Sequence, residues 1–193
     1  MQTFFISSTF KDMQAERDVL HKQIFPQLRK LTKEYGEDIQ EVDLRWGVDT
    51  ANMSEAQSGQ EVLKVCVDAI DRCKPYIVVL LGERYGWIPS KSTVDSVRDE
   101  RISDRYEQMM SITELEIKYG ALLNDDNLDH CIFCFRNADV IDKIDDEYKE
   151  HYCSESSVHA SRLEALKQKI REKKDAIILE YSADWDAQKH ELC

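Results

Sequence analysis

The chain has 193 residues, of which 38 are acidic and 26 basic, so its formal net charge at pH 7 is −12. Hydrophobic residues make up 42% of the chain, which supports a folded core and argues against disorder. This length fits a single domain over residues 1–193. The acidic charge argues against nucleic acids and anionic membranes as partners, because phosphate binders concentrate lysine and arginine.

The N-terminus and the apolar runs carry no targeting or membrane signal. Residues 1–6 lack the basic segment and cleavage site of a secretory signal, and no apolar run reaches the ~20 residues that span a bilayer. Most of the six cysteines lie in apolar-periodic segments, where a reduced thiol acts as a small hydrophobic group. Without a secretory signal, thiols are favoured over disulfides, so we expect a cytoplasmic protein.

In chain order, the apolar pattern first predicts a strand, a long helix and a second strand. Residues 3–7 form a β-rich run. A three- and four-residue periodicity then predicts a helix over residues 10–36, with a kink or break near Phe25, before the proline. Residues 39–44 alternate apolar and polar side chains, as a second strand does. A capping box at Ser54–Gln57 starts the next helix, whose apolar face extends to Cys73.

The rest of the chain predicts three more strands. Residues 76–81 form a continuous apolar run, typical of a central parallel strand. Residues 90–108 are polar, and we expect them to form a long surface loop or lid. The remaining elements are expected at 110–123 (helix), 131–135 (strand), 139–150 (an acidic helix face or loop), 161–173 (helix), 176–180 (strand) and 184–193 (the start of a helix).

This order of elements predicts an α/β fold. Because helices separate successive strands, the strands run parallel and the helices cover both faces of the sheet. We therefore expect a doubly wound, five-stranded parallel sheet.

Polar residues follow the predicted strands, where open parallel sheets bind ligands. The candidate ligand-binding residues are Ser7, Ser8 and Thr9 after the first strand, Asp43, Arg45 and Trp46 at the end of the second, and Glu83, Arg84 and Tyr85 after the third. Arg136 follows the fourth strand. Their shared position at one end of the sheet favours a common site.

Each candidate also has a structural interpretation. Residues 7–9 could cap the first helix, and Asp43 could form a salt bridge with Arg45. Gly82 and Gly86 could serve only to permit a sharp turn, while Trp87 could fill space below the lid.

Several familiar sites are missing from the sequence. No P-loop or dinucleotide-binding glycine pattern is present. Cys131 and Cys134 have the spacing of a metal or redox pair, but residues three apart in a strand point to opposite faces. The potential ligands His151, Cys153 and His159 are scattered, so we expect no metal site.

Two carboxylates, Glu114 and Glu116, open the helix that follows the lid. They could simply favour the N-terminal end of the helix dipole. Alternatively, a carboxylate that is partly desolvated at the end of an apolar strand suits electrostatic or nucleophilic work at a glycosidic carbon.

Taken together, these segments resemble the DUF4062 domain. The similarity rests on Phe5–Leu20 (FISSTFKDMQAERDVL), Glu41–Val48 (EVDLRWGV), Cys66–Trp87 (CVDAIDRCKPYIVVLLGERYGW) and Ser111–Gly120 (SITELEIKYG). The DUF4062 domain is found at the N-terminus of NACHT and other STAND NTPases with TPR or WD40 repeats. The resemblance thus implies that this chain is the N-terminal part of a larger protein, with the NTPase and repeats as partners in cis.

The resemblance also implies a flavodoxin-like, TIR-like fold and a role in signalling, including innate immunity or antiviral defence. In enzymatic TIR domains a glutamate early in the third helix serves NAD⁺ cleavage, and Glu116 fits that pattern best, with Glu114 as the fallback. Ser7, Ser8 and Thr9 would contact the nucleotide, and Arg84 or Arg45 would hold phosphate. This chain departs from the TIR pattern at Ile112, where those enzymes carry a tryptophan.

Three functions are considered, the third being a different nucleotide-processing activity at the same pocket. In the first, oligomerisation of the full-length protein activates NAD⁺ hydrolysis; NAD⁺ is then a substrate, and no bound cofactor is expected. In the second, the domain is a non-catalytic module that associates with other copies of itself or with partner proteins.

Overall fold

The structure, a computed structural model, describes residues 1–44, 55–123 and 125–193. Five strands of this part of the chain form one parallel sheet in the order β2-β1-β3-β4-β5. This is the strand order of flavodoxin, and it confirms the predicted doubly wound α/β fold. The strands are β1 (Gln2–Ser7), β2 (Ile39–Asp43), β3 (Ile77–Leu81), β4 (Cys131–Arg136) and β5 (Ile177–Tyr181).

The central strand β3 is buried along its whole length. Its run of isoleucine, valine and leucine suits this position, because helices cover both faces of a parallel sheet. β3 pairs with β1 on one side, with Phe5 opposite Ile77, and with β4 on the other, with Ile77 opposite Cys131. The edge strand β5 is more exposed.

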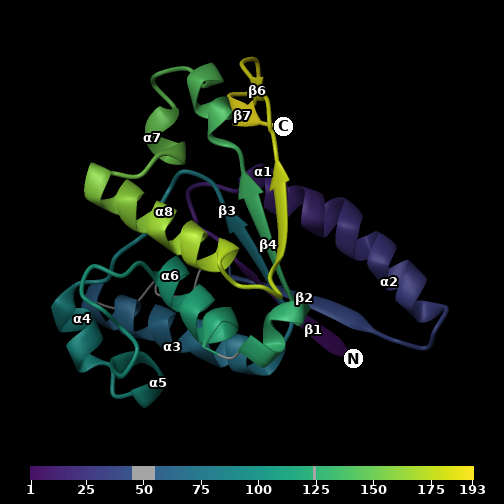
Figure 1. The fold of residues 1–193 in the computed structure, drawn as a ribbon, viewed down its shortest axis with the longest axis horizontal. Helices are drawn as coiled ribbons and strands as arrows, with labels where there is room; N and C mark the ends of the chain where they lie inside the picture. The colour runs from purple at the N-terminus through teal and green to yellow at the C-terminus, as the bar shows by residue number, and fades with distance from the viewer. Residues whose placement is uncertain (45–54, 124) are drawn as a thin grey trace.

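One face of the sheet packs against the first helical segment (Figure 1). This segment comprises α1 (Gln14–Val19), the π-helical η1 (Leu20–Ile24) and α2 (Phe25–Lys33). The π-helical turn ends two residues before Pro26, which lacks a backbone N–H donor and whose ring crowds the preceding turn. The predicted irregularity near Phe25 is therefore confirmed.

The opposite face is covered by α3 (Glu55–Cys73), α6 (Ile112–Ile117) with its π-helical extension η3 (Lys118–Leu122), and α8 (Ser157–Arg171) (Figure 1). A glycine brings η3 close to the sheet, since a Cβ at Gly120 would overlap the Ile77 side chain. The start of α3 at Ser54, predicted from the capping box, lies outside the described residues.

The prediction of a long surface loop or lid over residues 90–108 did not include two short helices in this segment. This segment forms α4 (Lys91–Ser96) and α5 (Glu100–Ser103), capped by the side chains of Ser90 and Asp99. Val94, Val97 and Ile102 are buried in the main core. Three apolar anchors held by two capped turns are enough to fold this polar segment onto α3.

The predicted final helix is wrong. Residues 184–193 form an antiparallel hairpin of β6 (Trp185–Asp186) and β7 (Glu191–Leu192). Trp185 lies opposite Leu192, which is buried, so these two large apolar side chains meet across the hairpin. A helix would have separated them.

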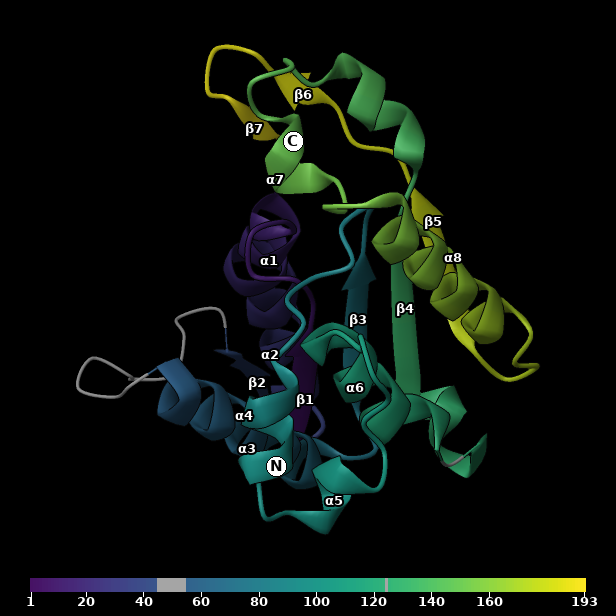
Figure 2. The same ribbon diagram turned by 90° about the vertical axis from the view of Figure 1, so that its left-hand side faces the viewer.

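A small second core lies above the carboxyl ends of β4 and β5 (Figure 2). It packs the hairpin against η5 (Ala138–Lys143) and α7 (Lys149–Tyr152), which occupy part of the predicted acidic segment. The remaining short element, η4 (Asp125–His130), precedes β4. None of the described helices is long and apolar enough to cross a membrane.

Candidate functional site

A cavity of about 390 Å³ opens between the loops that follow β1 and β3. The chain passes from β1 outward to β2 and then returns to the other side of β1 to form β3, so these two loops diverge. Parallel α/β sheets bind ligands in the crevice at such a point. The lining consists of residues 8–11 after β1, Arg84, Gly86 and Trp87 after β3, Ile112, Thr113 and Glu116 of α6, and Glu155.

A larger cavity of about 740 Å³ lies beside α4 and α5. Its titratable lining residues, Lys91, Asp95 and Tyr106, are all exposed or half-buried. The smaller cavity is the stronger candidate, because it contains a buried carboxyl group at the switch point of the sheet.

That carboxyl group belongs to Glu116, which lines the cavity while only 6% exposed. Its Oε2 accepts a hydrogen bond from Ser7 Oγ at 2.7 Å. Burial raises the pKa of Glu116 to about 7, although Ser7, the Cys66 thiol and the charge of Arg17 oppose the rise. The group therefore gains or loses its charge near neutral pH, where a catalytic carboxyl is most useful.

The neighbouring Glu114 is also buried but is not among the side chains that line the cavity. Its Oε1 pairs with Lys118 Nζ at 2.9 Å, and its Oε2 accepts a hydrogen bond from the Tyr85 hydroxyl. A cation and a phenol thus already hold this carboxylate. Of the two predicted candidates, the structure places Glu116 in the cavity.

The three hydroxyl residues after β1 divide into two roles. Ser7 is fully buried and donates to Glu116, whereas Ser8 and Thr9 line the cavity. The alternative interpretation, in which they cap the first helix, is wrong, because α1 begins only at Gln14 after Met13.

Of the second predicted group, only Asp43 lies among the described residues; Arg45 and Trp46 do not. Asp43 is buried behind the cavity and does not line it. Its Oδ1 lies 3.4 Å from Arg17 Nη1, so α1 supplies a cation for this carboxylate.

The side chains of the third predicted group, Glu83, Arg84 and Tyr85, point in three different directions. Glu83 turns toward α8, where its carboxylate pairs with Lys167 at 2.7 Å. The Tyr85 ring is buried, and its hydroxyl, with a pKa raised to about 12 chiefly by burial, contacts the start of α6. Only Arg84 lines the cavity.

Arg84 holds a remote segment against the cavity. Its Nη1 donates to the carbonyls of Glu150 at 2.6 Å and Cys153 at 3.1 Å, and its Nη2 donates to Glu155. Much of its donor capacity is therefore used within the protein, which leaves less for a ligand.

Two half-exposed aromatic rings line the cavity from different loops, Phe10 after β1 and Trp87 after β3. Gly86 allows these loops to approach each other. It has φ +97°, and a Cβ there would lie 3.0 Å from Thr9 Cγ2. Gly86 therefore permits both the positive φ and the close approach of the two loops.

Sequence reasoning did not include Phe10, Lys11, Thr113 or Glu155 among the site residues. Phe10 fitted the helical periodicity, although the helix begins four residues later. Lys11 lies two residues after Thr9, and Thr113 directly precedes Glu114. Glu155 reaches the cavity from a distant part of the chain, for which the sequence carried no signal.

No group of three or more metal-ligating side chains is found in the described part of the chain. Cys131 belongs to the main core and Cys134 to the cluster on the opposite face, which confirms that their sulfurs point apart. His159 packs its ring against Tyr85, with 5.8 Å between centroids.

Comparison with known proteins gives the family. Residues 3–191 match the family described as Domain of unknown function (DUF4062). The chain belongs to the DUF4062 family. The match covers both loops of the cavity and α6, so the candidate site is part of the DUF4062 domain.

Relatives of this DUF4062 domain are much longer proteins. It is 36% identical to a TPR repeat-containing protein of Dictyostelium discoideum over 86% of this chain and 10% of the relative. It is 29% identical to Telomerase protein component 1 of Rattus norvegicus over 94% of this chain and 7% of the relative. NACHT and WD repeat domain-containing protein 2 of Homo sapiens is 34% identical over 52% of this chain and 6% of the relative.

The DUF4062 domain thus spans at most a tenth of these relatives, and the names of two of them include NACHT, WD or TPR repeats. No solved structure matches the chain.

Proposed function

We propose that this domain hydrolyses the bond between nicotinamide and ribose in NAD⁺. It would act as a signalling or effector module in the cytoplasm, with a downstream NTPase and repeats in the same chain. The observation that carries the proposal is the buried Glu116 carboxyl in a cavity at the switch point of the sheet. The relatives named for NACHT and repeat domains support the signalling context.

The lining of the cavity suits a dinucleotide. The exposed rings of Phe10 and Trp87 offer faces on which a planar base can stack. Lys11 offers a cation for the diphosphate, and the hydroxyls of Ser8 and Thr9 offer hydrogen bonds to ribose. The positive charge of the nicotinamide ring favours a site next to Glu116.

In the proposed reaction, the bond between ribose C1′ and the nicotinamide nitrogen breaks. The bonding electron pair leaves with nicotinamide, which becomes neutral, and positive charge develops on the ribose. The ionised Glu116 carboxylate stabilises this charge, and buried surroundings strengthen the attraction. Water then bonds to C1′ and releases a proton, so that ADP-ribose and nicotinamide are formed.

Replacing Glu116 with glutamine is expected to reduce nicotinamide release by about 100-fold or more, since it removes the charge that faces the reacting ribose. The wild-type rate should rise with pH, reach half its maximum at about pH 7 and level off at higher pH, because the ionised form of Glu116 acts and its pKa is about 7. Both the loss in Glu116→Gln and the pH profile of the wild type are tested by measuring the release of nicotinamide from NAD⁺. The release by the full-length protein is followed by chromatography at pH values on both sides of 7.

Glu114→Gln is the matched control, because Glu114 lies on the same helix, is equally buried and does not line the cavity. It should retain the pH profile of the wild type. Equal activity of the wild type and Glu116→Gln would contradict the role of Glu116. Absence of release from assembled full-length protein would contradict the proposed reaction.

A second function, self-association of the domain, is favoured by an apolar groove of about 400 Å³ on the face of the sheet that packs against α1. Val19 of α1 and Leu179 of β5 line it and are 44% and 53% exposed. β5 is an edge strand, so pairing it with β5 of a second copy around a two-fold axis would bury both grooves.

Leu179→Glu is expected to weaken this self-association by at least about tenfold, because it places a charge in the apolar contact. The wild type should associate more strongly as salt increases, since salt screens the repulsion between chains that each carry a charge of −12. Sedimentation equilibrium measures both effects. Leu31→Glu, exposed on α2 and not among the groove's lining residues, is the control. A Leu179→Glu variant that associates like the wild type would contradict this interface.

A further inference from the structure

A histidine on η1 lies between two carboxylates of β2. His21 Nδ1 is 3.2 Å from Glu41 Oε1, and His21 Nε2 is 2.8 Å from Asp43 Oδ2. A carboxylate only accepts hydrogen bonds, and a neutral imidazole donates from one nitrogen alone. Both contacts can therefore be hydrogen bonds only when the ring is protonated.

Asp43 connects this histidine to a buried arginine. While Oδ2 faces His21, Oδ1 lies 3.4 Å from Arg17 Nη1, and both side chains of this pair are at most 2% exposed. Arg17 Nη2 also donates to the backbone carbonyl of Ser8 at 3.3 Å. The guanidinium is thus held beneath the loop that lines the cavity.

The same loop leads to Glu116. Ser7, adjacent to Ser8 at the end of β1, donates its hydroxyl to Glu116. The charges of Arg17 and Asp43 act on Glu116 in opposite directions: Arg17 lowers the pKa of Glu116, and Asp43 raises it. Any change in how Asp43 divides its interactions between His21 and Arg17 therefore alters the electrostatic potential at Glu116.

We propose that His21, Asp43 and Arg17 form a positioning relay in which a positive charge on His21 offsets the charge of Asp43 and so favours the ionised Glu116 carboxylate. This inference rests on the proposed function, because it gives Glu116 a working role. Without a positive charge at position 21, one hydrogen bond to β2 is lost. Glu116 then holds its own proton more tightly.

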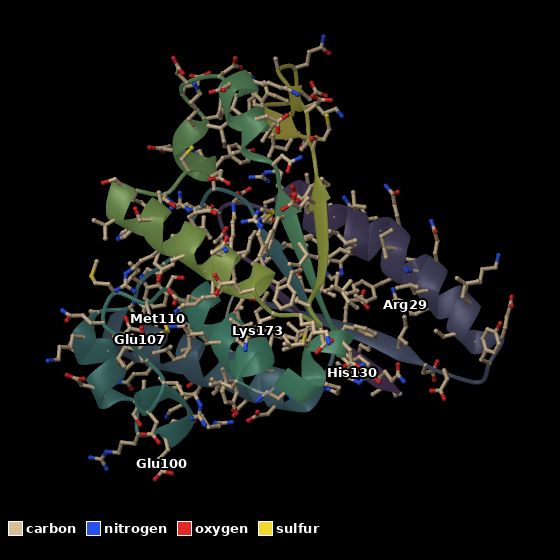
Figure 3. The ribbon with its side chains drawn as sticks, in the orientation of Figure 1. Arg29, Glu100, Glu107, Met110, His130 and Lys173 are labelled. Atoms are coloured by element: carbon tan, nitrogen blue, oxygen red, sulfur yellow. The ribbon has the colours of Figure 1, made fainter. Side chains whose placement is uncertain are left out.

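The surroundings of His21 keep the ring between its two carboxylate partners. Its side chain is 21% exposed, so solvent reaches it. Glu41 is also bound by Arg29 of α2, which is labelled in Figure 3, so this carboxylate stays ionised and in place. Among the described residues, the charged groups facing His21 are Glu41 and Asp43 of β2, with Arg17 of α1 and Arg29 of α2 as their partners, and the Phe25 ring packs at 6.4 Å.

Two substitutions at His21 are expected to move the titration of Glu116 in opposite directions. His21→Gln puts a neutral side chain between the two carboxylates, so the midpoint of Glu116 should rise by about half a pH unit. His21→Lys keeps a cation at neutral pH, so the midpoint should stay at or below that of the wild type. Asp43→Asn removes the charge that raises the pKa of Glu116 and should lower the midpoint.

The experiment is an NMR titration of the full-length protein labelled with ¹³C at its glutamate carboxyls, with the Glu116 signal assigned from Glu116→Gln. No NAD⁺ is present, so the relay is tested whether or not NAD⁺ is hydrolysed. His151→Gln, an exposed histidine on α7, is the control and should leave the midpoint unchanged. If hydrolysis occurs, its pH profile should shift with the same midpoints.

A midpoint that rises in His21→Gln and does not rise in His21→Lys supports the relay. An unchanged midpoint in His21→Gln, or an equal rise in both variants, overturns it, because a purely structural role would not depend on the charge. Failure of nicotinamide release with these NMR shifts intact would overturn the proposed hydrolysis alone.

Discussion

Replacing Arg136 with methionine is expected to lower the free energy of unfolding by about 3–5 kcal/mol. The guanidinium donates to both oxygens of Asp12, at 2.9 and 2.6 Å, and neither side chain is more than 1% exposed. Glu16 also pairs with Arg136 at 2.9 Å. Without the cation, two neighbouring carboxylates remain in a buried site with no compensating charge.

Urea denaturation at pH 7 measures this loss. Lys22→Met is the control, because its pair with Asp18 is exposed and removing it should change the unfolding free energy little. The double variant Asp12→Asn with Arg136→Met should recover part of the loss, since it also removes a buried charge. A stability of Arg136→Met close to that of Lys22→Met would contradict the buried pair.

The second large effect is a dependence of stability on pH through Glu116. Burial raises its pKa from 4.5 to about 7 on folding, so the folded state binds the proton more tightly than the unfolded state. The contribution of protonated Glu116 to the free energy of unfolding is therefore fully present below about pH 4.5 and is lost as pH rises through about 7. The expected loss over this window is about 3 kcal/mol, and Glu116→Gln should abolish it.

Unfolding free energies of the wild type and Glu116→Gln, measured at several values between pH 4.5 and 8, give the difference due to this group. The advantage of the variant should grow with pH and level off above about pH 7. Glu150→Gln, an exposed glutamate, should show no such trend. A difference between wild type and Glu116→Gln that does not change with pH would contradict the burial of an ionisable carboxyl at this position.

The strands and main helices could be predicted because each carries its own periodic signal. The apolar run of β3 and the helical repeat of α3 depend on local residue order, and both elements are present in the structure. The segment at 90–108 lacked such a repeat. It folds because Val94 and Ile102 pack onto other elements, which a local pattern does not reveal.

The candidate site could be predicted only in part. The topology of the sheet was enough to bring residues 8 and 9 together with Arg84. Which way each side chain points depends on its partner elsewhere in the fold. Thus Glu83 turns to Lys167, and Tyr85 turns to Glu114.

The sequence by itself determined the order of the five sheet strands and the position of the polar residues after them, and its resemblance to a known family made Glu116 the first candidate carboxylate. Only the tertiary structure separated Glu116 from Glu114. The first faces a cavity and is desolvated, while the second is neutralised by Lys118. The tertiary structure also brings His21, Asp43 and Arg17 into contact. Burial and charge pairing arise between residues distant in the chain, so they exist only once the chain has folded.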